Sequence, residues 1–177
     1  MPTIQLDNTD LRILQALQGD ARLTNVALAE RVNLSPSPCL ARVRELERSG
    51  VISRYVALVD PALVGLGLSV FIQISLDRQT GEAIQRFEST VSAYPEVVEC
   101  YLMTGDSDYL LRVVVPDVQA LKEFILNGLS TISCVASIRS SFALKQVKYD
   151  TALPLPPAGR PAPAPRRNPA ARRRKKN

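Results

Sequence analysis

The spacing of apolar residues changes once along this chain, and that change limits the fold more than any other feature. In residues 6–50 apolar side chains recur every three or four positions, as on the buried side of an amphipathic helix. From Leu68 to Leu76 they recur at every second position, as in a strand with one buried face. Between these segments, "DPALVGLG" combines an Asp-Pro pair with two glycines, which is typical of a connector. The pattern predicts a helical domain, a linker and a sheet domain, at residues 1–55, 56–67 and 68–153.

Three short helices are predicted in the N-terminal domain. Asp7 and Thr24 are placed to cap the first two helices, because their side chains can accept hydrogen bonds from free backbone N–H groups. Ser35 is expected to cap the third, with Pro36 at the first helical position, where a missing N–H group costs nothing. Gly50 ends this helix, and the alternating "VISRYVALV" after it is predicted to form short wing strands.

The third predicted helix has two different faces. One is apolar and carries Cys39, Val43 and Leu46; the other carries Ser37, Ala41, Arg44 and Arg48, with Arg42 beside the apolar stripe. Small residues permit close approach to the major groove, and arginines reach guanine edges or phosphates. We therefore predict a helix-turn-helix at about residues 25–48. Its candidate DNA contacts are Thr24, Asn25, Ser35, Ser37, Pro38, Ala41, Arg42, Arg44, Arg48 and Arg54. Alternatively, this is an ordinary solvent-exposed helix face, whose positive charge is reduced by Glu45 and Glu47.

The C-terminal domain is predicted to have the order βαββαβ. Strands are expected at Leu68–Leu76, Val97–Met103, Tyr109–Val115 and Val135–Tyr149, and helices at Glu82–Ala93 and after Asp117. The fold class is α+β, with a ferredoxin-like sheet covered by helices on one face. Phe71 interrupts the polar side of the first strand, so the other face of the sheet is expected to pair with a second copy. A homodimer would present two helices to half-sites about one turn of DNA apart.

The net charge of +5 belongs to the end of the chain. From Arg160 onward there are eight basic residues and no acidic ones. The rest of the chain has 22 − 8 = 14 basic and 17 acidic residues, and therefore a net charge of −3. We predict that residues 154–177 form a disordered basic tail rich in proline, alanine and arginine. This tail either adds attraction to DNA phosphates or is a solubilising extension.

The absence of histidine excludes Ser-His, Cys-His and His-metal chemistry. No catalytic residue, metal site or cofactor is predicted. Cys39, Cys100 and Cys134 are far apart and are expected to be reduced and buried, which favours a cytoplasmic location. No secretory signal is visible, and no apolar run is long enough for a membrane helix.

The segment "LDNTDLRILQALQGDARLTNVALAERVNLSPSPCLARVRELERSGVI" resembles the winged helix-turn-helix of the Lrp/AsnC, or feast/famine, family of bacterial transcription regulators. Within it, "LSPSPCLARVRELE" is especially similar to the leucine-responsive branch, and the similarity covers roughly residues 5–153. The resemblance implies a nucleoid-associated, sequence-specific regulator of amino-acid metabolism that binds double-stranded DNA. It also implies homodimers that assemble into tetramers or octamers and bind leucine or a similar free amino acid between subunits.

The stretch "YLMTGDSDYLL" resembles the effector-binding hairpin of that family. The resemblance assigns effector binding to Leu102, Gly105, Asp106 and Asp108, and the apolar Met103 beside Leu102 is a further candidate contact. The carboxylates would accept the ligand ammonium group, and the apolar residues would contact its side chain. A tight hairpin without a ligand is the alternative. "ISCV" at residues 132–135 departs from the family's usual Leu-Pro-Gly-Val-like turn, which leaves the ligand preference open.

Two other classes of function compete with DNA-binding regulation. One is a ligand sensor that acts on a protein partner. The other is an enzyme similar to haem-pathway decarboxylases, which resemble this family but depend on histidines that this chain lacks. The exposed arginines expected on the third helix favour DNA, so we predict a regulator and no enzyme activity.

Overall fold

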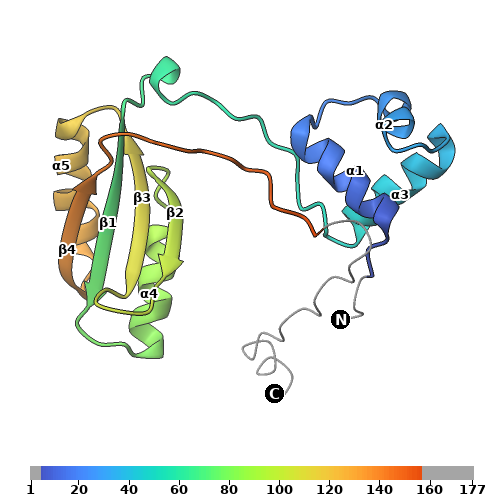
Figure 1. The fold of residues 1–177 in the computed structure, drawn as a ribbon. Coiled ribbons are helices and arrows are strands. Elements are labelled where there is room, and N and C mark those ends of the chain that lie inside the picture. Colours follow the sequence, from blue (N-terminus) through green and yellow to red (C-terminus); the bar gives the residue numbers. More distant parts are fainter. Residues whose placement is uncertain (1–4, 157–177) are drawn as a thin grey trace. The chain divides into compact units, whose positions relative to one another are not determined.

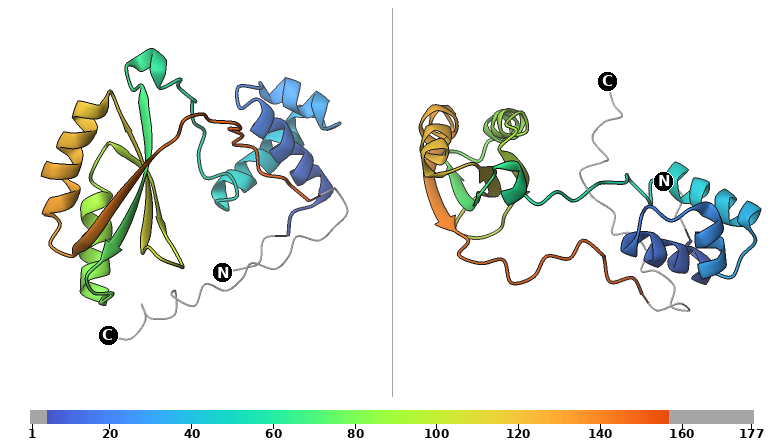
Figure 2. Two further views of the ribbon diagram at one scale, coloured as in Figure 1. Left: turned by 60° about the vertical axis from the view of Figure 1, so that its left-hand side comes forward. Right: turned by 90° about the horizontal axis from the view of Figure 1, so that it is seen from above.

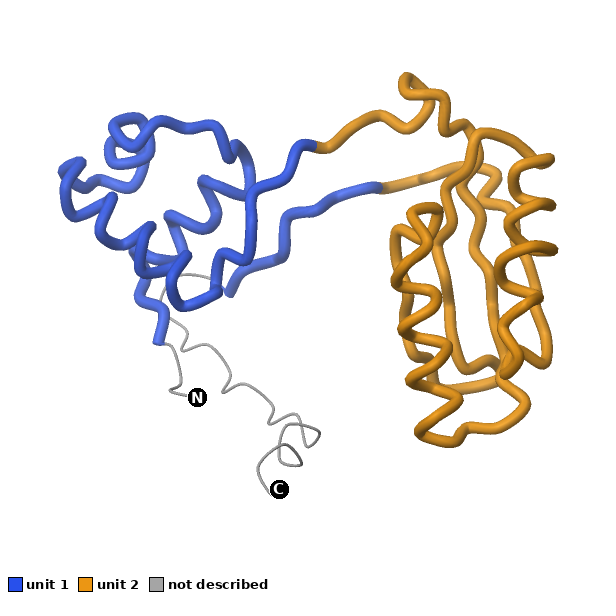
Figure 3. The backbone as a smooth tube through the Cα atoms, turned by 180° about the vertical axis from the view of Figure 1, so that it is seen from behind, with its two compact units in different colours: residues 1–57, 149–177 blue, residues 58–148 orange. Residues whose placement is uncertain are grey.

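The computed structural model describes residues 5–156, which belong to two compact units (Figure 3). Of these residues, 5–57 and 149–156 belong to the first unit, and 58–148 to the second. In this division the second unit ends at residue 148, and the domain boundary at residue 153 expected from the sequence stays a prediction. Residues 154–156, expected to begin a disordered tail, instead pack in the first unit; residues 157–177 lie outside the described part.

The first unit contains three helices, α1 (Asn8–Gly19), α2 (Asn25–Arg31) and α3 (Pro36–Arg48), as predicted (Figure 1). Asp7 caps α1 by accepting hydrogen bonds from the N–H groups of Thr9 and Asp10, and Thr24 caps α2. Ser35 is at the N-cap position of α3, but its side chain makes no capping hydrogen bond, contrary to expectation. Pro38, the third helical residue, has no N–H group, so one of the two donors that an N-cap side chain ordinarily uses is missing.

The core of the first unit is made by one face of each helix. Its most deeply buried members are Ile13, Leu28, Ala29, Val32, Cys39 and Leu46. The predicted wing strands are absent: residues 53–60 form no strand. A β ladder needs two paired strands, and Val56, Leu58 and Val59 are each more than half exposed without a partner strand in the part of the chain that the structure describes.

The second unit confirms the predicted βαββαβ order. Its elements are β1 (Leu68–Leu76), α4 (Gly81–Val91), β2 (Val97–Leu102), β3 (Tyr109–Val115), α5 (Val118–Asn127) and β4 (Val135–Phe142), with short 3-10 helices at Ala62–Val64 and Leu129–Thr131. The four strands form one antiparallel sheet in the order β2-β3-β1-β4. Strand β4 ends at Phe142 and not at Tyr149, because Phe142 pairs with Val70, near the start of β1, and little of that strand remains to pair with.

Helices α4 and α5 cover the same face of this sheet (Figure 2). Val70, Ile72 and Ile74 of β1 point into the core beneath them and are completely buried. On the open face, Phe71 is opposite Arg112, whose guanidinium is paired with Glu99 at 2.6 Å. Phe71 and Tyr101 leave this face partly apolar, as predicted, since they are 37% and 51% exposed.

All three cysteines are free thiols in the described range, and two of them, Cys39 and Cys134, are buried. Cys100 is exposed, contrary to expectation, because it lies on β2, an edge strand of the sheet. Among the described helices, none combines the length and apolar character needed to cross a bilayer.

Candidate nucleic-acid interface and ligand pocket

Helix α3 is anchored on one side and open on the other. Cys39 and Leu46 are buried in the core, and Val43 is partly buried beside them. The opposite side is exposed along its whole length, from Ser37 and Pro38 through Ala41 to Arg44 and Arg48. The helix is therefore held by its apolar face and offers a polar face to solvent.

The three arginines of α3 differ in their bonding within the described residues. Arg42 is paired with α1, since its Nη1 lies 2.6 Å from Asp7 Oδ2 and 2.8 Å from Asp10 Oδ1. Arg48 makes two hydrogen bonds to Glu45 on its own helix, at 2.8 and 2.6 Å. Arg44 has neither a salt bridge nor a side-chain hydrogen bond to any residue within 5–156. Of the three guanidinium groups, that of Arg44 is therefore the most available to an external partner.

The predicted residues of α2 and the following turn serve mainly to place α3. The Thr24 hydroxyl accepts the N–H of Ala27, and the Asn25 side chain donates to the Pro36 carbonyl at 2.8 Å, which ties α2 to the start of α3. Asn33 adopts a left-handed conformation (φ 56°) in the turn between the helices, which asparagine tolerates better than most residues. The Ser35 hydroxyl and Arg54 are exposed.

Replacing Arg42 with alanine is expected to loosen the contact between α1 and α3. We expect a loss of about 0.5–1 kcal/mol in unfolding free energy, because solvent screens an ion pair that is more than a third exposed. The pKa of Asp7 is lowered by the Asp10 N–H and by Arg42. Stabilisation is therefore complete above the ordinary carboxyl pKa and is lost as pH falls through the lowered value.

Urea unfolding of Arg42→Ala at neutral and acidic pH measures this effect. Arg12→Ala, also on the first unit but bonded within residues 5–156 only to Thr9, is the matched control and should unfold like the parent. An Arg42→Ala protein whose deficit is as large in acid as at neutral pH would contradict a role through ion pairing.

The second unit contains a cavity of about 340 Å³ at the β2–β3 hairpin. It is lined by the end of β1, the start of α4 and the hairpin itself: Leu76, Gln79, Ile84, Leu102, Met103, Thr104, Gly105, Asp108 and Tyr109. The structure thus brings together four of the five predicted effector residues. Asp106 is exposed and is not among the residues that line this cavity.

Asp108 holds the hairpin against the end of β1. One carboxylate oxygen accepts the Leu76 N–H and the other accepts the Gln79 side chain, both at 2.7 Å. Its own backbone N–H donates to Ile74, and its carbonyl accepts from Met103. This carboxylate is therefore both part of the cavity wall and a structural brace.

Other parts of the cavity wall have no signal in the sequence. Gln79 and Ile84 lie at least 18 positions before Leu102, the first hairpin residue in the cavity wall, so no local pattern marks them. The pattern marks Tyr109 only as a strand residue, yet its ring packs on Phe87 with centroids 4.5 Å apart and its hydroxyl donates to Glu88. Burial, together with Glu88, raises the pKa of Tyr109.

Family models match both units of the chain. Residues 6–53 match a winged helix-turn-helix DNA-binding domain, and residues 69–153 match the Lrp/AsnC ligand-binding domain. The winged helix-turn-helix assignment therefore stands, although residues 53–60 form no wing strand.

Two regulators illustrate the similarity of the whole chain. The Bkd operon transcriptional regulator of Pseudomonas aeruginosa is 46% identical over 151 residues, which are 85% of this chain and 99% of that protein. The leucine-responsive regulatory protein of Escherichia coli K12 is 40% identical over 152 residues, covering 86% of this chain and 93% of that protein.

Solved structures agree with the sequence comparison. A transcriptional regulator of Neisseria meningitidis in complex with L-methionine superposes with a TM-score of 0.81 at 46% identity, covering 84% of this chain and 96% of the other. Escherichia coli AsnC gives a TM-score of 0.74 at 28% identity, with 82% and 97% coverage. These relatives are regulators of transcription and not enzymes, and they match both units of this chain. The chain therefore belongs to the Lrp/AsnC family of DNA-binding transcriptional regulators.

Proposed function

We propose that this regulator binds specific DNA sites through the exposed face of α3, and that a free amino acid modulates this binding to control amino-acid metabolism. The observation that carries the proposal is α3 itself, whose apolar face is buried while Ser37 and Arg44 are exposed and free of intramolecular partners in the described chain. Arginine on such a face reaches guanine edges or phosphates, and a serine hydroxyl contacts either.

The proposed effector is leucine or another apolar amino acid, bound in the hairpin cavity. Leu102, Met103 and Ile84 supply an apolar wall, and Asp108 supplies a carboxylate that can accept from an ammonium group. The Neisseria meningitidis relative was solved with L-methionine, and several relatives are named leucine-responsive, which supports an apolar ligand.

The proposed assembly is a homodimer that forms tetramers or octamers on bacterial DNA in the cytoplasm. The partly apolar open face of the sheet, with Phe71 and Tyr101 exposed, supports pairing of two copies. Dimers would offer two α3 helices to half-sites about 34 Å apart. An effector shifts such an equilibrium only if it binds the alternative assemblies with different affinity.

Calorimetric titration with single amino acids tests the ligand, and light scattering in the same solutions tests the assembly. We expect heat from leucine or methionine, little from aspartate, and a change in particle mass with the binding amino acid. Leu102→Lys should abolish the heat by placing a charge in the cavity wall, whereas Leu126→Lys, an exposed leucine on α5, should not. Heat from none of the twenty amino acids, or the same heat in Leu102→Lys, would rule out this effector site.

A further inference from the structure

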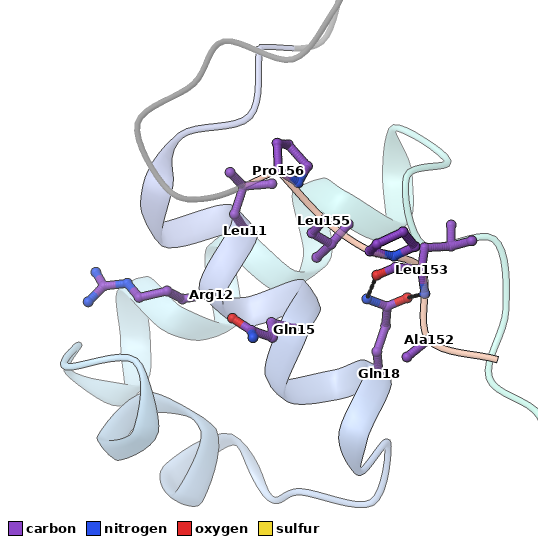
Figure 4. Close-up of a pocket in the computed structure, with 9 residues that line it drawn as sticks. Leu11, Arg12, Gln15, Gln18, Ala152, Leu153, Leu155 and Pro156 are labelled. Atoms are coloured by element: carbon purple, nitrogen blue, oxygen red, sulfur yellow. Dashed lines mark hydrogen bonds between the residues drawn. The ribbon is translucent and has the colours of Figure 1, made fainter. Parts of the chain in front are cut away.

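A short C-terminal segment, residues 152–156, runs along α1 in the first unit (Figure 4). We call it the C-terminal strap. The side-chain amide of Gln18 bonds to both backbone groups of Leu153: its Nε2 donates to the Leu153 carbonyl at 3.2 Å, and its Oε1 accepts the Leu153 N–H at 2.6 Å. One side chain of α1 thus holds a residue that is 135 positions away in the sequence.

Apolar packing adds to these two hydrogen bonds. Leu155 is partly buried and packs against the helical core of the first unit. Pro154 and Pro156 have restricted φ angles, so fewer conformations are lost when the strap lies against α1. The packing is incomplete, because the strap and α1 line a cavity of about 320 Å³, with Leu11 and Gln15 in its wall. The contact is therefore specific but small, as expected of a segment that detaches by local opening.

The chain passes between the two units twice. Residues 58–148 form the second unit, and the chain on both sides of them belongs to the first. Residues 53–61 on the outward path and residues 143–151 on the return path contain no helix or strand and are exposed throughout. The return segment, residues 143–151, follows directly on β4, which ends at Phe142, and leads directly into the strap. The strap is therefore the point at which the return path is attached to the first unit.

We propose that the C-terminal strap is a detachable second fastening of the DNA-binding unit. When it is docked, the return segment, which spans at most about 35 Å when fully extended, limits the positions that α3 can take relative to the second unit. When it is detached, only the outward linker restrains the first unit.

This proposal rests on the DNA-binding function and the homodimer proposed above. A dimer that holds both α3 helices within a limited range presents the second helix to its half-site at a higher effective concentration once the first helix is bound. Less freedom is then lost on binding, which is the general advantage of preorganisation. The strap is thus expected to favour binding to paired half-sites without contacting DNA itself.

Two paired changes in the full chain test the proposal. Gln18→Ala with Leu155→Ser removes both hydrogen bonds and the packed leucine, and is the release variant. Gln15→Ala with Leu144→Ser is the matched control, because Gln15 has no side-chain hydrogen bond within residues 5–156 and Leu144 is 98% exposed. If thermal unfolding by circular dichroism shows that the release variant has lost its fold, Leu153→Pro takes its place, since it removes only the N–H that Gln18 accepts.

Two measurements without DNA report the docking and the restraint. In hydrogen exchange followed by mass spectrometry, the Leu153 amide of the parent should exchange more slowly than the amides of residues 143–151, and the release variant should lose this protection. In small-angle X-ray scattering, the release variant should have a larger maximum dimension than the parent and the control. Light scattering in the same solutions should give all three the same particle mass.

Fluorescence anisotropy with two duplexes measures the effect on DNA binding. One duplex is selected from random sequence by the parent protein, and the other keeps only one half of its footprint. The release variant should bind the full duplex about three- to tenfold more weakly than the parent, because the effective concentration of the second helix falls. It should bind the half duplex as the parent does, and the control should match the parent on both.

An unprotected Leu153 amide in the parent, or a protected one in the release variant, would overturn the proposal. An equal maximum dimension would do the same, and so would a changed particle mass, since the strap would then act in assembly. Equal weakening on both duplexes would place the effect in the first unit itself and would also count against the strap. If the parent selects no duplex, the proposed DNA-binding function fails, while exchange and scattering still decide whether the strap restrains the first unit.

Discussion

Arg44→Ala should weaken binding to a specific DNA site by about 10- to 100-fold, the loss expected for one arginine contact to a base edge. The reason lies in the distribution of charge along α3. Arg42 is neutralised by Asp7 and Asp10, and Arg48 by Glu45, whereas Arg44 is exposed with no ion-pair partner in residues 5–156. Binding to unrelated DNA should fall much less, because phosphate attraction is shared among many basic residues.

Competition binding, with a labelled specific duplex and unlabelled unrelated DNA, separates these two effects. Arg86→Ala, an exposed arginine on α4 of the second unit, is the charge-matched control and should bind like the parent. Arg42→Ala should reduce specific affinity less than Arg44→Ala does. Equal affinity of parent and Arg44→Ala for the specific duplex would show that the exposed face of α3 does not contact bases.

Asp108→Ala is expected to lower the unfolding free energy by about 1–3 kcal/mol, because it leaves the Leu76 N–H in a partly buried position without an acceptor. It also frees Gln79 and removes a carboxylate from the cavity wall, so amino-acid binding should fall at least about tenfold, as expected for loss of a charge-assisted hydrogen bond. Asp108→Asn, which keeps one acceptor oxygen for Leu76, should recover much of the stability but little of the binding.

Asp106→Ala is the matched comparison for Asp108→Ala. This carboxylate is exposed and outside the cavity lining, so its removal should leave the urea midpoint unchanged and reduce calorimetric binding less than Asp108→Ala does. The hairpin motif by itself assigns both acids to the effector. A larger loss of binding in Asp106→Ala than in Asp108→Ala would place the ligand outside the cavity described above.

The elements that the sequence predicted well are those specified by neighbouring residues. Strands Leu68–Leu76 and Tyr109–Val115 have the predicted bounds, Asp7 and Thr24 cap the helices that they were expected to cap, and a helix begins directly after Asp117 as predicted. The errors in strand assignment came from pairing. The segment after α3 alternates like a strand but has no partner strand in the described chain, and β4 stops near the end of the partner it pairs with.

The candidate sites were predicted in outline only. The outward face of α3 and four of the five hairpin residues lie as the motifs indicate. The partners of Arg42 lie more than 30 residues away, so its role in joining α3 to α1 has no local signal. The same holds for Gln79 in the cavity wall. It also holds for Gln18, whose side chain accepts a hydrogen bond from the distant Leu153 N–H.

From its sequence alone, this protein can be assigned its helices, most of its strands, its fold and its family, because periodicity, capping and motifs depend on residues close together in the chain. Tertiary structure alone decided which arginine of α3 has no partner among the described residues, which acid supports the cavity wall and which side chain bonds to the backbone of Leu153. Those outcomes depend on contacts between distant residues, whose geometry is set only when the chain packs.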